Sequence, residues 1–237
     1  MIHGAALVMA AMIGGSAMAA GTLPTAPEQC QEDISLKSYC TEMVAGTFSG
    51  PIELRFFLSV EKSAFVSIEE AMNQYLNFEQ WPAFAEQAEA TNIVYRSSVS
   101  LPSIFDEVNK RDVFRHYADF KIAAPIVQWQ EVRSVTHNYW VDPYEGALAS
   151  IEFVVQNEGS QDVPPGADPL EGAIGITSQT GSFHGVDCAT TNKLCPEDSY
   201  LIIYDSVVEP DLDILPKISG GAIQAVIEKL MLGMYLR

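Results

Sequence analysis

The sequence predicts an α+β fold in which a curved antiparallel sheet of about seven strands grips a long carboxy-terminal helix. Three observations predict it. Seven segments are rich in β-branched and aromatic residues, the connections after the second strand are too short for crossover helices, and the last segment repeats apolar residues at helical spacing. An order of strand, two helices, six strands and one helix places the last helix across the concave side of the sheet. One domain over residues 51–237 accounts for this body.

Residues 1–19 have the pattern of a secretory signal peptide. An apolar run over residues 2–13 is followed by small residues and an A-x-A cleavage site at Ala17-Met18-Ala19. The alternative is an ordinary buried helix, because no Lys or Arg precedes the run. The run is too short to span a bilayer. We therefore expect a soluble periplasmic or secreted protein with no stable membrane anchor.

Residues 20–50 form a lead-in that is rich in Pro, Glu, Ser and Thr and has no clean period. The chain has four cysteines, and an exported chain favours cystines over free thiols. Three pairings are possible. The two local ones, Cys30–Cys40 and Cys188–Cys195, are favoured because each pair lies within one turn-rich segment. A metal site is disfavoured because the chain has no Cys-x-x-Cys and no nearby pair of histidines.

The folded body begins with a strand and two helices. Residues 51–60 alternate as a strand does, and Ser67 with Glu70 forms a capping box that starts a helix. That helix continues to Trp81-Pro82, where the proline ring must end or kink it. Residues 83–90 form a possible second, short helix.

Six further strands follow, separated by segments rich in Pro, Gly, Asp and Asn. Their predicted ranges are 91–100, 112–122, 126–140, 147–156, 173–186 and 199–208.

The last helix has one broad apolar face, with Gln224 and Glu228 opposite it. A helix of this kind laid over a curved sheet can leave a pocket beneath it. The apolar face consists of Ala222, Ile223, Val226, Ile227, Leu230, Met231 and Met234.

Two local motifs resemble the helix-grip proteins of the START and polyketide-cyclase superfamily. The segment Asn77-Phe-Glu-Gln-Trp-Pro-Ala-Phe84 is similar to the turn after that family's first helix, with Asn77 in place of the usual acid. The segment 204–216 is similar to its last strand and the Leu-Pro entry to the gripping helix. The resemblance covers residues 52–237 and implies a helix-grip fold. The motifs are structural and say little about chemistry, and the family is mostly cytosolic or membrane-tethered and free of cystines.

His116 is the first polar candidate for a binding or catalytic role. It shares one face of its predicted strand with Phe114, Ala118, Phe120 and Ile122, and this face is expected to line the concavity. A buried imidazole needs a partner, because leaving it unpaired costs on the order of 1–3 kcal/mol. His116 is therefore a ligand anchor, a general base, or simply a satisfied core histidine.

Glu131 and Arg133 are the second candidates. They share one face of the next strand with Trp129, His137 and Tyr139. If this face turned inward, its carboxylate, guanidinium and imidazole could perform acid–base chemistry on a carbonyl compound. If it turned outward, Glu131 and Arg133 would form a charged ladder. The outward orientation is the preferred prediction.

Charge and motifs exclude several classes of function. The chain has 237 residues, 48% of them apolar, and 13 Lys and Arg against 31 Asp and Glu give a net charge of -18. That charge excludes nucleic acid as a partner, because binding a phosphate backbone requires a positive patch. The chain has no Gly-x-Ser-x-Gly and no phosphate-binding glycine loop.

These expectations combine into one predicted function and two alternatives. The prediction is an exported protein that binds or transfers a lipid or isoprenoid-like ligand without a cofactor, with residues 157–168 as a loop beside the pocket mouth. One alternative is a cyclase or dehydratase acting on a polyketide-like carbonyl compound in the same cavity. The other is an interaction module that uses the acidic surface. The predicted ligand-binding residues are Phe114, His116, Phe120, Ile223, Val226, Ile227, Leu230 and Met234.

Overall fold

The computed structural model has the predicted α+β fold over the residues that it describes. These are residues 21–45, 51–90, 93–123, 129–155, 174–190, 194–210 and 220–235. The predicted signal peptide and the loop 157–168 lie outside them. In chain order the elements are α1 (Glu28–Lys37), β1 (Tyr39–Ala45), β2 (Ile52–Glu61), η1 (Lys62–Ala64), α2 (Ile68–Leu76), η2 (Phe78–Gln80), α3 (Trp81–Gln87), β3 (Ile93–Asp106), β4 (Arg111–Ala123), β5 (Trp129–Val141), β6 (Ala149–Val155), β7 (Ile174–Asp187), β8 (Ser199–Pro210) and α4 (Gly220–Tyr235).

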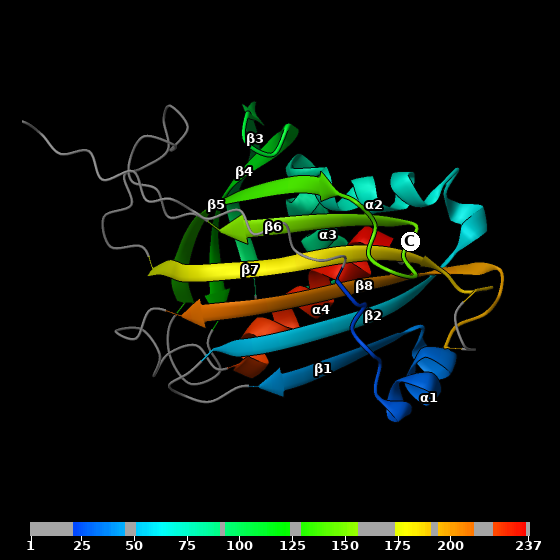
Figure 1. Ribbon diagram of the computed structural model, residues 1–237. Helices are drawn as coiled ribbons and strands as arrows, with labels where there is room; N and C mark the ends of the chain where they lie inside the picture. Colours follow the sequence, from blue (N-terminus) through cyan, green and yellow to red (C-terminus); the bar gives the residue numbers. More distant parts are fainter. Residues whose placement is uncertain are drawn as a thin grey trace, which may run out of the picture.

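The described strands form one sheet in the order β1-β2-β8-β7-β6-β5-β4-β3. Neighbouring strands run antiparallel, as the short connections predict. Strand β6 is short, so β5 and β7 pair directly and in parallel beyond its end, at Val132 and Ile174. Helices α3 and α4 lie behind the sheet in Figure 1. A curved antiparallel sheet holding its carboxy-terminal helix is the helix-grip architecture, and this prediction is confirmed.

The main apolar core lies between the sheet and helices α2, α3 and α4. Residues at alternate positions of each strand point toward these helices. Phe56, Ile202, Phe183 and Phe153 contribute from four adjacent strands, and all are at least 97% buried. Tyr75 of α2 stacks on the Phe183 ring at a centroid distance of 4.6 Å. The sheet face with these residues is the concave face of the prediction.

The sequence signals at helices α2 and α3 are confirmed in part. The Ser67 hydroxyl accepts a hydrogen bond from the Glu70 amide, so α2 starts where the capping box predicts. The helix ends at Leu76, earlier than predicted, and Trp81-Pro82 starts α3 instead of ending α2. A proline fits the first turn of a helix because the amide that it lacks has no intrahelical partner there.

A second, smaller core lies on the opposite face of the sheet and holds both disulfides. Cys30 pairs with Cys40, and Cys188 pairs with Cys195, as favoured from the sequence. Cys30 and Ile34 of α1 belong to this core, together with the other three cysteines and with Phe57, Val186, Leu201 and Ile203 of the sheet. The dark blue segment before α1 crosses the front of the sheet in Figure 1.

The lead-in therefore has more structure than the sequence predicts. It contains α1 and β1, and β1 extends the sheet to eight strands among the described residues. Helix α1 buries mainly Cys30 and Ile34, so it lacks the broad apolar stripe that periodicity detects. The disulfide and the edge of the sheet stabilise it instead.

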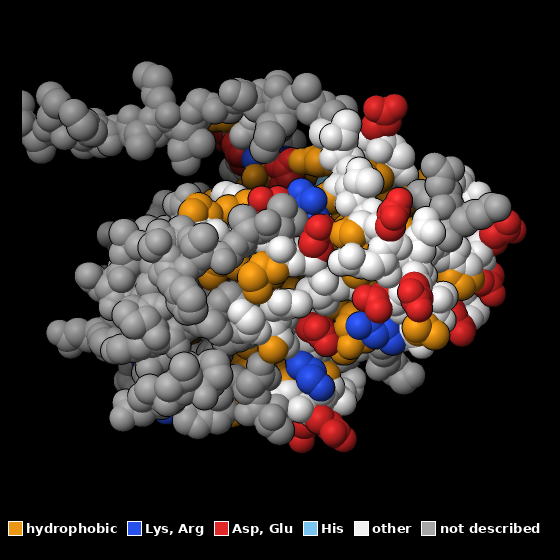
Figure 2. Space-filling view, turned by 90° about the horizontal axis from the view of Figure 1, so that it is seen from below, with side chains coloured by type: hydrophobic (Ala, Val, Ile, Leu, Met, Phe, Trp, Pro, Cys, Tyr) orange, Lys and Arg blue, Asp and Glu red, His pale blue; other side chains and the backbone are white. Residues whose placement is uncertain are grey.

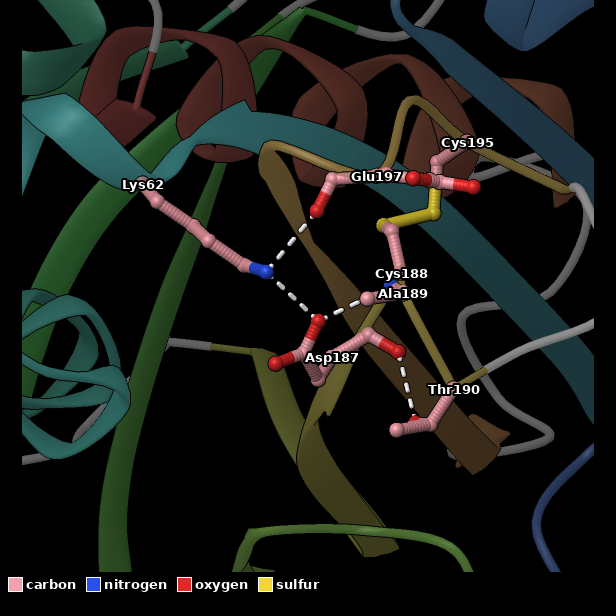
Figure 3. The surroundings of a disulfide bond; sticks show 7 residues. All are labelled: Lys62, Asp187, Cys188, Ala189, Thr190, Cys195 and Glu197. Carbon is pink, nitrogen blue, oxygen red and sulfur yellow. Dashed lines mark hydrogen bonds and ion pairs between the residues drawn. A yellow bond between two sulfur atoms is a disulfide. The ribbon is translucent and has the colours of Figure 1, made fainter.

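The Cys188–Cys195 disulfide closes the connection between the end of β7 and the start of β8, and Lys62 of η1 is bonded to this connection (Figure 3). The Lys62 ammonium donates to the Asp187 carboxylate at 2.6 Å and to the Glu197 carbonyl at 2.8 Å. Asp187 also accepts from the Ala189 amide. These bonds lower the pKa of Asp187, with the Lys62 hydrogen bond as the largest cause.

Acidic side chains are spread over the surface seen in Figure 2, with few basic ones between them. None of the described helices is long and apolar enough to cross a membrane.

Candidate functional site

Helix α4 is fixed to three different elements by polar contacts. The Glu228 carboxylate accepts hydrogen bonds from the Tyr39 hydroxyl at 2.9 Å and the Thr41 hydroxyl at 3.4 Å, both on β1. The Lys229 ammonium donates to the carbonyl of Ala88 after α3, at 3.1 Å. The Tyr235 hydroxyl donates to the Ala71 carbonyl of α2. These contacts lie at or after Glu228, so they hold the second half of the helix.

The second half of α4 is also tightly packed. Leu230, Met231, Met234 and Tyr235 are buried in the main core. Gly233 lies so close to α3 that an added Cβ would collide with the Phe84 carbonyl group. This part of the interior is filled by side chains of the protein.

The first half of α4 lies over apolar side chains that belong to two clusters. Beneath it, Ile52, Leu54 and Val208 form a cluster that is separate from the main core among the described residues. Ile227 is partly buried and packs against both clusters, while Val226 belongs to the main core. The side chain of Ile223, which was predicted to line the pocket, lies outside the described residues.

His116 lies on the concave face, as predicted, and is 2% exposed. Its ring stacks on Phe78 with centroids 4.3 Å apart and planes 4° from parallel, and the Trp81 ring lies 4.7 Å away. The Trp81 indole is itself fixed by donating to the Tyr75 carbonyl at 3.1 Å. Burial lowers the pKa of His116 to about 3, so the ring is neutral at pH 7.

The hydrogen bonds of Ser98 define the tautomer of His116. The Ser98 hydroxyl lies 2.5 Å from the Phe78 carbonyl oxygen and 2.8 Å from His116 Nε2. A carbonyl can only accept, so the hydroxyl proton goes to Phe78 and His116 Nε2–H donates to Ser98. His116 therefore does not act as a base toward Ser98. The protein itself satisfies Nε2, and aromatic side chains of the core enclose the ring.

The two aromatic residues predicted beside His116 lie on the same face of β4. Phe114 pairs with Asn138 of β5, and Phe120 pairs with Val132. Phe120 is partly buried, packs on the main core and lies 5.4 Å from the Tyr95 ring. Asn138 is fully buried, and its amide donates to the Phe114 carbonyl.

Arg133 lies on the opposite face of the sheet, as the preferred prediction has it. It pairs across the strands with Asp119, and its Nε lies 3.2 Å from the Asp119 carboxylate. Both side chains are more than 90% buried, so this is not the solvated ladder that was expected. The Glu131 side chain lies outside the described residues. Arg133 and His116 thus lie on different faces and do not share a cavity.

A second buried histidine lies on the same face as Arg133. His184 Nδ1 is 2.9 Å from the Ser150 hydroxyl, and Nε2 is 2.8 Å from the Ser182 hydroxyl. Burial lowers the pKa of His184 to about 4. A neutral imidazole donates from one nitrogen and accepts at the other, so the two serines satisfy it completely. No cluster of three metal-ligating side chains occurs in the described parts of the chain.

A groove of about 410 Å³ lies between α3 and the start of β3. Its lining is partly apolar and includes two exposed carboxylates, Glu86 and Glu89. It is open to solvent and lies apart from the face of α4 that was predicted to line a pocket. The lining residues are Pro82, Ala85, Glu86, Glu89, Ala90, Ile93, Val94 and Tyr95.

Two features of this region were not found from the sequence. The partners of His116 come from η2, α3 and β3, and no periodicity links these distant segments. Glu228 was placed on the solvent side of α4, but β1 lies against it, and β1 itself was not predicted. Burial and the Glu228 hydrogen bond raise the pKa of Tyr39 to about 12, so this hydroxyl stays protonated as a donor.

Comparisons with known proteins add a structural similarity. No family model matches the chain, and no curated protein matches its sequence. Among solved structures, the chain is similar to the human StarD13 (DLC2) lipid transfer and protein localization domain. The identity is 8% and the TM-score 0.43, over 87% of this chain and 94% of that domain.

Proposed function

We propose that the protein binds an apolar small molecule, of the lipid or isoprenoid class, between the first half of α4 and the concave face of the sheet. Transport or sequestration of that molecule is the corresponding role. Burial of apolar surface supplies the driving free energy, at roughly 25 cal/mol per Å².

The apolar lining beneath the first half of α4 carries this proposal. The separate cluster of Ile52, Leu54 and Val208 shares the concave face with the main core, and Ile227 lies between them. All of these side chains are apolar, so a guest between α4 and the sheet would contact apolar side chains of both elements. The polar contacts described above hold the second half of α4, and we expect the first half to adapt to a guest.

The proposed location is a periplasmic or secreted compartment. The signal-like segment over residues 1–19 supports export. The two disulfides also support it, because such bonds persist in oxidising environments.

The geometry does not favour the enzyme alternative. His116 donates to Ser98 and is enclosed by two aromatic rings. Arg133 lies on the other face of the sheet and pairs with Asp119.

A binding titration with the fluorescent fatty acid cis-parinaric acid tests this proposal. The variant Ile227→Trp adds bulk between the two apolar clusters, and Leu36→Trp places the same ring on α1, where Leu36 is 76% exposed. We expect saturable binding to the unaltered protein and to Leu36→Trp. We expect at least about tenfold weaker binding to Ile227→Trp, since blocking the space removes about 1.4 kcal/mol or more.

Circular dichroism and the thermal midpoint establish that each variant is folded before the titration is interpreted. Equal affinity of all three proteins would place the probe elsewhere and contradict the proposed site.

A further inference from the structure

The loop between β3 and β4 carries an unusual group of exposed apolar side chains. We define the β3–β4 tip as residues 104–111. Within it, Ile104, Phe105 and Val108 are 45%, 51% and 85% exposed. Strand β3 is at the edge of the sheet (Figure 1). Several exposed apolar side chains at one end of an edge hairpin are a feature of interaction sites.

The tip extends beyond its neighbour in the sheet. Pairing between β4 and β5 begins at Phe114, so residues 111–113 pair with β3 but not with β5. The register of β3 also shifts between Leu101 and Ile104, which changes the course of the strand just before the tip. The exposed apolar side chains therefore project from the body of the protein.

The tip is held in shape by its own polar groups. One Asp106 carboxylate oxygen accepts from the backbone amides of Val108 and Asn109, at 3.1 Å each. The other accepts from the Asn109 side chain at 2.7 Å. These bonds lower the pKa of Asp106, with the Asn109 side chain as the largest cause. Phe105 and Val108 are thus presented by an ordered turn.

The charges of the tip cancel within it. Lys110 pairs with Glu107 at 2.7 Å, and Arg111 lies 3.5 Å from Asp106 while its guanidinium stacks over the Tyr139 ring. Two acids and two bases cancel within residues 104–111. Exposed Asp112, which pairs across the strands with Phe105, leaves a single negative charge beside the tip of a protein whose net charge is -18. An apolar tip with so little net charge fits a surface that is apolar beneath and electrically neutral above.

We propose that the β3–β4 tip docks reversibly on a net-neutral lipid surface, with Phe105 and Val108 inserted at the interface. This inference goes beyond the proposed function, since it concerns a surface outside the α4 region and its test needs no bound ligand. The acidic body stays in solution, where anionic lipid would repel it.

Cosedimentation with phosphatidylcholine vesicles tests the docking. We expect the unaltered protein to bind these vesicles equally well at 0.15 M and 1 M NaCl, because the contact is apolar. Adding about a third of phosphatidylglycerol should weaken the binding. The double variant Phe105→Ser/Val108→Ser should bind roughly tenfold or more weakly, since burying either side chain contributes about that factor.

A matched control uses an exposed valine elsewhere. Val66 is 93% exposed and precedes α2, and Val66→Ser should bind vesicles like the unaltered protein. Equal binding by the double variant, or binding that requires anionic lipid, would overturn the proposal. The proposal would also be overturned if the double variant lost self-association but bound vesicles as before. The tip would then contact a second copy of the chain.

The cis-parinaric acid titration of the same double variant separates this proposal from the proposed function. Unchanged probe binding with lost vesicle binding supports docking by the tip. Vesicle binding by a protein that takes up no probe would leave the docking proposal standing and contradict the ligand site.

Discussion

Burial keeps the His116 ring neutral, and this lowers the stability of the folded protein at low pH. The folded protein excludes the proton because the pKa of His116 is lowered to about 3, whereas the unfolded chain binds it near pH 6.5. Below pH 6.5 the unfolded state therefore holds more protons than the folded state. Stability contributed by the neutral ring is complete above pH 6.5 and decreases as the pH falls toward 3.

The variant His116→Phe tests this linkage. Phenylalanine can keep the stack on Phe78, and Ser98 keeps its carbonyl acceptor. Between pH 7 and pH 4.5, the unfolding free energy of the variant should improve relative to the unaltered protein by roughly 2–3 kcal/mol. Urea unfolding at several pH values measures this difference. Phe120→Leu is the control, and its change in unfolding free energy should not depend on pH. If the change caused by His116→Phe were also independent of pH, His116 would have an ordinary pKa in the folded protein.

The contact of Gly233 with Phe84 predicts a large effect from a single methyl group. In Gly233→Ala the new Cβ meets backbone, which cannot rotate away, so the free energy of unfolding should fall by about 2 kcal/mol or more. Gly221→Ala is the control in the same helix, at an exposed position, and should be neutral or slightly stabilising. Chemical denaturation measures both, and equal effects would refute the close approach of α3 and α4.

At the scale of elements, α4 and β1 depend on each other. Tyr39→Phe keeps the ring stack on Phe56 but removes the hydrogen bond to Glu228, and should cost about 1–2 kcal/mol. A double-mutant cycle with Glu228→Ala measures the coupling. The two changes should be clearly non-additive. Additive effects would show that the hydroxyl and the carboxylate do not interact in solution.

The two disulfides stabilise different ends of the smaller core. Cys30→Ala/Cys40→Ala opens a link between residues 10 apart, and should cost roughly 2–3 kcal/mol. Hydrogen exchange should show faster exchange of the α1 amides, while strands β3, β4 and β5 stay protected. Cys188→Ala/Cys195→Ala should leave the α1 amides protected and affect the turn between β7 and β8 instead. Identical exchange patterns in the two variants would contradict this assignment.

For the whole molecule, the sequence predicts what depends on local pattern. The seven strands of the body and the capping box at Ser67 follow from periodicity and turn residues, and the structure confirms them. It also confirms the apolar face of α4 from Val226 to Met234, the part whose side chains are described. The sequence pattern does not predict β1, because the place of this strand in the sheet depends on pairing with β2 and on the Cys30–Cys40 disulfide. The partners of His116 were hidden for a related reason, since the tertiary fold alone brings Phe78, Ser98 and Trp81 to it.

The orientation of Arg133 shows which properties of a side chain can be predicted from alternation along a strand. Alternation predicts that Arg133 lies on the face of the sheet that does not line the main core, but it does not predict that the charged side chain is buried. That burial depends on neighbours from other parts of the chain, and the Asp119 carboxylate compensates it. Pattern thus predicts the face, and packing determines the environment.

Native mass spectrometry of the protein, isolated without detergent from cells that export it, tests the central claim most directly. We predict a non-covalent adduct of one apolar molecule per chain, which organic solvent extracts and which Ile227→Trp carries at strongly reduced occupancy. An unaltered protein that is free of any adduct and also fails to take up cis-parinaric acid would contradict the account.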